Sequence, residues 1–155
     1  MINKNPISVQ HGTFVAGELI GNNFIVESIL AVGSNCIVLS AKPKGQPQAA
    51  SVAIKISEEK VGRTALATET TILQSVKINK HFARIIESGH HKQFNYIVTQ
   101  LLGSNLRDLA LHHPTSTFSL RTLLKFAYQA VEAIQSLHQV GFVHGSVNAE
   151  IHNKP

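Results

Sequence analysis

The stretch Ser51-Val52-Ala53-Ile54-Lys55 decides the fold, because its apolar residues read as a strand that ends in a lysine. Fourteen residues later, Glu69 lies in residues 62–77, a segment with helical periodicity. At about 100° per residue, Glu69 shares a narrow sector of that helix with three apolar side chains, Leu66, Leu73 and Val76. A carboxylate on an apolar face is expected to face the core, where a charge needs a partner. We therefore expect Lys55 to pair with Glu69, which leaves an oriented amine for binding phosphate.

Composition sets the broad class of the protein. A chain of 155 residues with 43% hydrophobic and 15% charged residues is typical of one globular domain. No apolar run reaches the roughly 18 residues of a membrane span, and the first residues lack the apolar core of a signal peptide. Cys36 is the single cysteine, so no intrachain disulfide can form. We expect an intracellular protein, cytoplasmic or nuclear, with no membrane association.

Basic residues and histidines are scattered along the chain. The net charge of +5 comes from dispersed lysines and arginines that do not interleave with aromatic residues, which favours a solvated surface over a nucleic-acid interface. The nine histidines include the adjacent pairs 90–91 and 112–113, but no cysteine or carboxylate cluster stands at ligand spacing near them. We expect no metal site and no nucleic-acid partner.

Turn residues divide the chain into short strands followed by helices. We expect strands over residues 24–32, 36–41, 50–57, 83–87 and 94–99, with the helix of Glu69 between the third and fourth. Residues 101–104 read as a connector, followed by helices near 105–111 and 120–140. The expected organisation is an extended leader over 1–22, a strand-rich region over 23–103, helices over 104–144 and a divergent tail over 145–155.

The long helix is more apolar than a surface helix requires. Ser119 is a plausible N-cap, and Gly141 suits the position after the last turn. Apolar residues between 120 and 140 occupy roughly 200° of the helix circumference, whereas a surface helix needs about 100°. We expect either a protein partner that covers this helix or a chain that is one piece of something larger.

Four segments together resemble a known family. They are Val-Ala-Ile-Lys at 52–55, FNYIVTQLLGSNLRDL at 94–109, TFSLRTL at 117–123 and HQVGFVH at 138–144. From about residue 17 to 144 the chain resembles the first part of a casein kinase I superfamily domain, closest to the tau-tubulin kinase branch, and this covers a little under half of such a domain. The resemblance implies an α+β fold: a protein-kinase-like N-lobe, with a five-stranded antiparallel sheet plus a helix, followed by the first helices of the C-lobe only.

The resemblance also implies roles for individual residues. Lys55 would hold the α- and β-phosphates of ATP, and Glu69 would orient it. Thr99 would be the gatekeeper of the nucleotide pocket. The full set of implied nucleotide-binding residues is Leu30, Gly33, Val38, Ala53, Lys55, Glu69, Gln100 and Leu102. For the three apolar residues Leu30, Val38 and Ala53, a plain role in the strand core stays open.

The chain departs from the family pattern where catalysis would occur. The three glycines of the phosphate-binding loop fall at Ala31, Gly33 and Cys36, so one survives. The catalytic-loop motif falls on residues 144–151, where His144 is kept but the base aspartate, the lysine and the metal-binding asparagine become Ser146, Asn148 and Ile151. No Asp-Phe-Gly segment follows. We therefore expect no catalytic residues beyond this vestigial loop, weak ATP binding at most, and no Mg²⁺ site.

Three functions compete on these grounds. The first is a non-catalytic, pseudokinase-type module that binds nucleotide or a protein partner. The second is the N-terminal fragment of an active Ser/Thr protein kinase whose remaining exons are missing from this chain, and the third is an unstable, non-functional fragment. Turnover by the chain as written is not expected, because a serine cannot accept the substrate proton at neutral pH and an isoleucine offers magnesium no oxygen.

Overall fold

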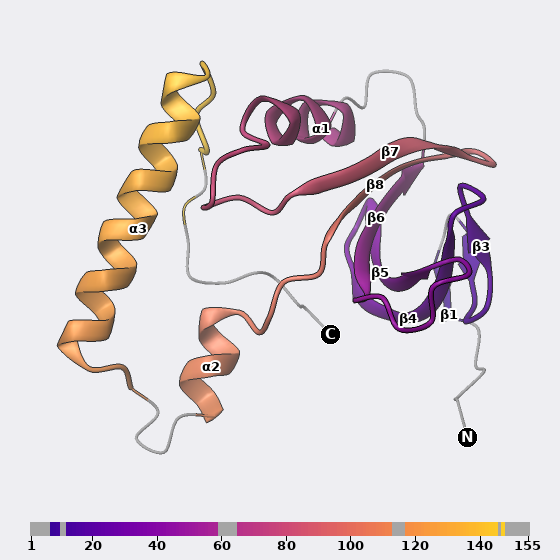
Figure 1. The fold of residues 1–155 in the computed structure, drawn as a ribbon, viewed down its shortest axis with the longest axis horizontal. Helices are drawn as coiled ribbons and strands as arrows, with labels where there is room; N and C mark the ends of the chain where they lie inside the picture. The colour runs from indigo at the N-terminus through magenta and orange to yellow at the C-terminus, as the bar shows by residue number, and fades with distance from the viewer. Residues whose placement is uncertain (1–6, 10–11, 59–64, 113–116, 146, 148–155) are drawn as a thin grey trace. The chain divides into compact units, whose positions relative to one another are not determined.

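The computed structural model describes residues 7–9, 12–58, 65–112, 117–145 and 147 (Figure 1). Its contacts divide the chain into two compact units. The sheet unit comprises Met1–Thr70 and Ile85–Leu101, and the helical unit comprises Thr71–Arg84 and Leu102–Pro155. Within the described part of the chain, no helix is long and apolar enough to cross a membrane.

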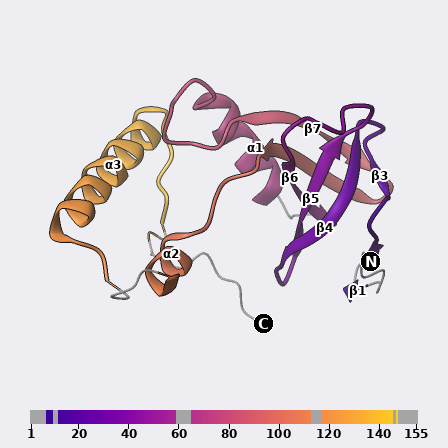
Figure 2. The same cartoon turned by 60° about the horizontal axis from the view of Figure 1, so that its bottom comes forward.

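The sheet unit is built on six antiparallel strands in the spatial order β3-β4-β5-β6-β8-β7 (Figure 2). Their bounds are Leu19–Ile20 for β3, Phe24–Val32 for β4, Cys36–Pro43 for β5, Val52–Glu58 for β6, Ile85–His91 for β7 and Phe94–Gln100 for β8. The five strands expected from the sequence are all present, and β3 adds a sixth of two residues. A separate two-stranded sheet pairs β1 (Ile7–Val9) with β2 (Gly12–Phe14). The expected α+β fold class is confirmed.

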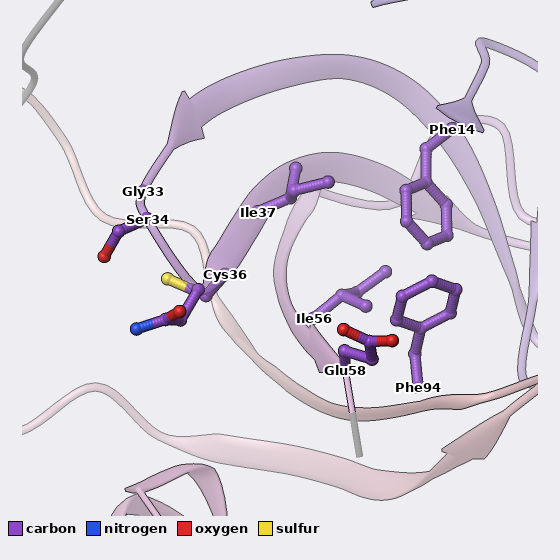
Figure 3. A pocket seen from close by; sticks show the side chains of 9 residues that line it. Phe14, Gly33, Ser34, Cys36, Ile37, Ile56, Glu58 and Phe94 are labelled. Carbon is purple, nitrogen blue, oxygen red and sulfur yellow. The ribbon is translucent and has the colours of Figure 1, made fainter. Parts of the chain in front are cut away.

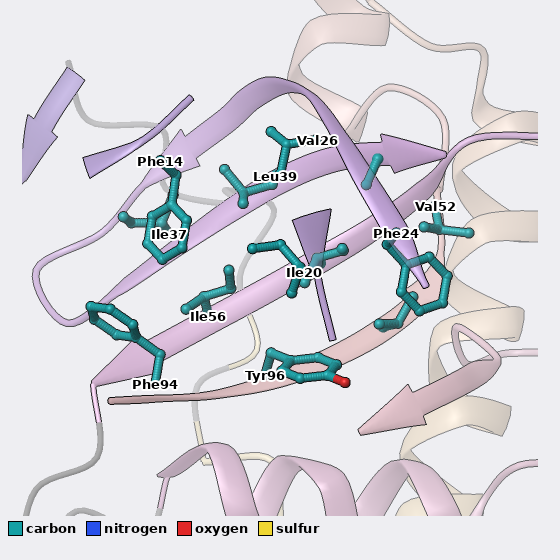
Figure 4. Close-up of a cluster of buried hydrophobic side chains, with 13 residues drawn as sticks. Phe14, Ile20, Phe24, Val26, Ile37, Leu39, Val52, Ile56, Phe94 and Tyr96 are labelled. Atoms are coloured by element: carbon teal, nitrogen blue, oxygen red, sulfur yellow. The ribbon is translucent and has the colours of Figure 1, made fainter. Parts of the chain in front are cut away.

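Alternation along the strands places one row of side chains in a common core (Figure 4). In β6, for example, Val52, Ile54 and Ile56 are buried, whereas the residues between them are half-buried. The other core side chains are Phe14, Ile20, Phe24, Val26, Ile37, Leu39, Ala41, Phe94, Tyr96 and Val98. The opposite face of β5 and β6 is therefore left for a site.

Two residues of the expected leader, residues 1–22, belong to this core. Phe14 at the end of β2 is 3% exposed, and its ring meets that of Phe94 edge-on, with centroids 5.3 Å apart. Ile20 in β3 is fully buried. An isolated aromatic and an isolated isoleucine carry no periodic signal, so the sequence did not reveal their burial. The described part of residues 12–20 is thus packed structure of the sheet unit.

Three helices accompany the strands. Helix α1 spans Ala65–Ser75, α2 spans Leu106–His112 and α3 spans Leu120–Gln139, close to the ranges expected from the sequence. Residues 62–64 of the first expected helix lie outside the described residues. The division between the two units falls within α1, at Thr70 and Thr71. The domain boundaries expected from the sequence stay predictions.

Both ends of α3 carry the expected caps. The Ser119 hydroxyl accepts a hydrogen bond of 3.2 Å from the backbone N–H of Thr122, which confirms Ser119 as the N-cap. At the other end, Gly141 has a φ of 85°, and its N–H donates to the carbonyl of His138. The N–H of Phe142 donates to the carbonyl of Leu137, and this pair of bonds is a Schellman motif.

The apolar surface of α3 is open to solvent. Along α3, every residue of which the structure describes, Leu137 alone is buried. The large apolar side chains that stay exposed are Leu120, Leu123, Leu124, Phe126, Tyr128 and Val131. Two of these side chains, Leu123 and Phe126, line a groove of about 580 Å³ within the helical unit together with Phe118 and residues of α2 that include Leu106 and Leu109. The expected partner for this helix stays a prediction.

Candidate functional site

Lys55 and Glu69 form the ion pair that the sequence predicts. Lys55 lies near the middle of β6, where it pairs with Val38 of β5 and Ile97 of β8. Its Nζ lies 2.6 Å from Oε2 of Glu69 in α1. Both residues belong to the sheet unit, so this contact lies within one compact unit. The central strand and the helix together hold an ammonium group at a defined position on one face of the sheet.

The pair is less buried than its place on an apolar helix face indicated. The side chains of Lys55 and Glu69 are 34% and 37% exposed, whereas Leu66, one turn earlier in α1, is buried. The expectation that the Glu69 carboxylate faces the core is therefore wrong. The carboxylate lies at the edge of the core, where water still solvates it. Solvent screening limits the contribution of such a pair to folding to about 1 kcal/mol or less. The pair is better suited to orienting the amine than to stabilising the fold.

The strand register gathers several of the predicted pocket residues around Lys55. Ser40 pairs with Ala53, and Ala53 pairs with Thr99 on β8. Val38, Ala53 and Thr99 are half-buried, as expected for side chains that alternate with the core row. Val38 and Ala53, with Thr99 next to Ala53, form an apolar surface on the same face of the sheet as Lys55, since residues paired across strands or two apart in one strand share a face. Val38 and Ala53 are thus less buried than the core residues that alternate with them, and their place in the nucleotide pocket stays a prediction.

Leu30 reaches the neighbourhood of this surface through an irregularity in β4. The register of β4 against β5 shifts between Ile29 and Ala31, which makes Leu30 a bulged residue. A bulge redirects a side chain out of the regular alternation, and Leu30 is exposed. Gln100, at the end of β8, is also exposed, whereas the predicted site residue Leu102 belongs to the helical unit.

A second bulge in β4 creates a polar cluster that the sequence did not reveal. Glu27 lies at the register shift between Val26 and Ser28. Its Oε2 accepts hydrogen bonds of 2.7 Å from Ser51 and 2.9 Å from Ser40. The bond from Ser51 has the largest effect on the pKa of the Glu27 carboxyl and lowers it; burial opposes this, but the bond from Ser40 and the charge of Lys42 also lower the pKa, which therefore lies below its ordinary value. Only the register shift brings these residues together, so no spacing rule could have found them.

The turn from β4 to β5 stands where the resemblance places the phosphate-binding loop. Gly33 donates its N–H to the carbonyl of Cys36 at 2.8 Å, and Ser57 donates its hydroxyl to the carbonyl of Asn35 at 2.9 Å. Both bonds tie the turn to the sheet. Gly33 thus lies in the turn between the two strands, as predicted, but its backbone N–H is already used in a hydrogen bond within that turn.

A small cavity opens beneath this turn, on the core side of the sheet (Figure 3). Its volume is about 20 Å³, and its walls include Ile37, Ile56, Phe94 and Glu58. A space of this size holds about one water molecule, whereas sites for small organic ligands need roughly 300 Å³ or more. The cavity is therefore not a nucleotide site.

The predicted vestigial catalytic loop lies mostly outside the described residues. His144 is described and exposed, whereas Ser146 and Asn148 fall outside the described part of the chain, as does Ile151. Among the residues that the structure describes, no three His, Cys, Asp or Glu side chains gather as a metal site would require. The arrangement that the structure does show is a lysine–glutamate pair beside an apolar surface.

Such a site can bind an anionic group next to a flat apolar ring. ATP, the ligand that the resemblance implies, fits this site only in part. The Lys55 ammonium would hold phosphate oxygens and the surface of Val38 and Ala53 would contact the base, so these residues fit a nucleotide. The β4–β5 turn shows hydrogen bonds closed on itself and on β6, which does not fit a phosphate cradle.

Comparison with known proteins places these features in context. A probable serine/threonine-protein kinase of Dictyostelium discoideum is 29% identical over 139 residues, which cover 90% of this chain and 28% of that protein. A Caenorhabditis elegans protein whose name proposes a casein kinase I is 27% identical over 134 residues, which cover 84% of this chain and 39% of that protein. The chain thus spans well under half the length of these curated relatives.

The fold has a close counterpart among solved structures. The crystal structure of a kinase domain superposes with a TM-score of 0.76 at 18% sequence identity, covering 90% of this chain and 42% of that one. At this identity the likeness concerns the fold alone. Residues 24–151 match the sequence pattern of the protein tyrosine and serine/threonine kinases. Because this match covers more than half of the chain, and the sheet, the helix and their ion pair agree with it, the protein belongs to the protein tyrosine and serine/threonine kinase family.

Proposed function

We propose that this chain is a non-catalytic, pseudokinase-type module of the casein kinase I superfamily, on its tau-tubulin kinase-like branch, that binds adenine nucleotide weakly. The observation that carries the proposal is the 2.6 Å contact between Lys55 Nζ and Glu69 Oε2. Glu69 holds the lysine against the sheet, so its ammonium group loses less freedom when it meets a phosphate. In kinases this pair must be in place for nucleotide to bind productively.

The residues at the catalytic positions support binding without turnover. Ser146 stands where the family has its base aspartate, and Ile151 stands where it has a metal-binding asparagine. A bound Mg²⁺·ATP would supply the transferable phosphoryl group and the metal charge that stabilises its transfer. Here the residues of the chain can bind and orient a nucleotide, but none of those named accepts a proton from a substrate hydroxyl at neutral pH.

A thermal-shift titration with ATP and with ADP tests the binding function. Ligand at ten times its Kd stabilises the folded state by about 1.4 kcal/mol, which raises the melting temperature by several degrees. Lys55→Ala is expected to abolish the shift, whereas Lys44→Ala, on an exposed loop lysine, is expected to keep it. An equal shift in both variants would place the nucleotide elsewhere and sink the proposal. A chain with no cooperative melt would favour an unstable, non-functional fragment.

A second candidate is the N-terminal part of an active Ser/Thr protein kinase. The observation in its favour is that the chain spans 28% and 39% of two curated relatives. Sequencing full-length transcripts separates the two readings. A continuous message that encodes Arg-Asp in place of Gly145-Ser146, with a downstream Asp-Phe-Gly, would support the enzyme, and a message that ends with this chain would exclude it.

We also propose that a protein partner covers α3. The support is the row of exposed apolar side chains, since exposed apolar patches of this kind mark interaction surfaces or aggregation liabilities. Purified protein is expected to self-associate or to bind a hydrophobic dye, and Leu124→Glu with Val131→Glu is expected to reduce both. Purified protein that is monomeric and does not bind the dye would remove the basis of this proposal.

A further inference from the structure

Cys36, the first residue of β5 after the β4–β5 turn, lies on the same face of the sheet as Lys55. Cys36 pairs with Ser57, and Val38 pairs with Lys55. Residues paired across antiparallel strands share a face, and so do residues two apart in one strand. Cys36, Val38, Lys55 and Ser57 therefore lie on one face of the sheet. The phosphates of a nucleotide held by Lys55 would approach the turn from this face.

The Asn35–Cys36 peptide presents an oxygen there. The carbonyl of Asn35 accepts a 2.9 Å hydrogen bond from the hydroxyl of Ser57. In a trans peptide the C=O and the following N–H point in opposite directions, and none of the described peptide bonds is cis. The N–H of Cys36 accordingly points away from Ser57. A phosphate beside Ser57 would meet a carbonyl oxygen, which repels it, where a phosphate-binding loop offers a donor.

The backbone of the turn does not form an anion-binding concavity either. Successive N–H groups converge on an anion when a residue of right-handed helical conformation is followed by one of left-handed conformation. Residues 33–36 are all described, and none of them has a positive φ. The N–H of Gly33 is already bonded to the carbonyl of Cys36. The amides of this turn therefore do not converge.

The thiol of Cys36 occupies part of the remaining space. A Cβ placed on Gly33 would lie 3.2 Å from Sγ of Cys36, so the sulfur lies directly over this glycine. A thiol is a weak donor, and it fills the volume through which a phosphate would approach the Gly33 backbone. Backbone direction, backbone conformation and a side chain thus all oppose phosphate binding at the turn.

We propose that this chain holds an adenine nucleotide through Lys55 and the apolar surface alone, without the β4–β5 turn, so that it accepts ADP and ATP equally. The inference rests on the proposed nucleotide binding and assigns it a ligand class. The turn directs no hydrogen-bond donors at the γ-phosphate. The γ-phosphate would therefore lose hydrogen bonds to water without gaining any from the turn, and it would not improve the affinity for ATP over ADP. Each charge-assisted hydrogen bond to it would otherwise improve the Kd by about tenfold or more.

Isothermal titration calorimetry of the whole chain tests the inference. The Kd values of ATP and ADP are expected to agree within about threefold, with and without magnesium, since one charge-assisted bond would exceed that ratio. ATP binding about tenfold tighter than ADP in magnesium would overturn the inference and leave the proposed function standing. No heat with either nucleotide, confirmed by an unchanged melting temperature, would overturn both.

A gain-of-discrimination variant provides the second arm. Cys36→Gly with Ser57→Ala removes the thiol, releases the Asn35 carbonyl and gives position 36 access to positive φ. This variant is expected to bind ATP several-fold tighter than ADP, while the control Ser88→Ala, at an exposed position of β7, keeps the original ratio. A folded double variant with an unchanged ratio would show that the turn is not what limits phosphate binding. If the double variant does not fold, the ratio measured on the unaltered chain decides the matter.

Discussion

Replacing Gly21 with alanine is expected to destabilise the sheet unit by about 2–5 kcal/mol. Two features of the structure produce this cost. Gly21 has a φ of 58°, where an alanine costs about 1–2 kcal/mol. Its Cβ would lie 2.1 Å from the hydroxyl oxygen of Tyr96 and 2.7 Å from the ring carbon that bears it. Relieving such an overlap in a packed interior costs about 1–3 kcal/mol.

Tyr96 cannot move aside cheaply. Its side chain is in the core, and its hydroxyl donates a 2.7 Å hydrogen bond to Oε1 of Glu87. The other oxygen of Glu87 accepts a 3.0 Å bond from the Asn23 side chain. An alanine at position 21 would therefore disturb a network that joins the β3–β4 turn to β7 and β8.

Two matched variants separate the backbone cost from the steric cost. Gly45→Ala places a side chain at a φ of 76° with no atom within 4 Å of its Cβ, so about 1–2 kcal/mol is expected. Gly89→Ala has no positive φ, but its Cβ would lie 2.8 Å from the same hydroxyl, so about 1–3 kcal/mol is expected. Urea unfolding followed by far-UV circular dichroism measures all three. If Gly21→Ala lowers the free energy of unfolding no more than Gly45→Ala does, the Tyr96 hydroxyl does not lie as close to position 21 as the structure places it.

Three further predictions follow from single contacts. Phe14→Ala is expected to cost about 3–5 kcal/mol in urea unfolding, because it empties a core site against Phe94, and a cost below 1 kcal/mol would contradict the burial of this segment. Burial, then the bond to Glu87, raises the pKa of Tyr96 to about 12. The stability from this group is therefore fully present below its unfolded pKa of about 10 and is lost as pH rises through 12. Tyr96→Phe is expected to remove that alkaline loss, and an identical alkaline profile in the variant would refute the assignment. Ser119→Ala is expected to lower the stability of α3 by about 1 kcal/mol, with faster amide exchange in its first turn than in its last; uniform exchange would argue against the cap.

The strands were predictable because their pattern is local. Alternation in residues 52–56 and the Gly33-Ser34-Asn35 turn place β4, β5 and β6 within two residues of their observed bounds. The caps of α3 were equally accessible, since Ser119 and Gly141 act on backbone groups a few residues away. The pairing of Lys55 with Glu69 needed one further step, because it joins two elements, but a charge on an apolar helix face pointed to it.

Other features depend on contacts between distant residues. Phe14 and Ile20 carry no periodicity, yet they complete the core because side chains from distant strands pack with them. The Glu27 cluster depends on a bulge, and a one-residue shift in register has no fixed signature in sequence. The exposure of Glu69 was misjudged because helical periodicity gives the direction of a side chain and not how closely its neighbours pack.

The sequence by itself determined the family and the order of strands and helices, because each depends on side-chain type and short-range spacing, and it named the nucleotide-pocket residues as a prediction. Tertiary structure alone decided how those residues can act. It placed Lys55 2.6 Å from Glu69 at a solvated margin, and it turned the Asn35 carbonyl toward Ser57. The orientation of a peptide group and the burial of a charged side chain depend on how segments far apart in the chain pack, so they are properties of the folded molecule.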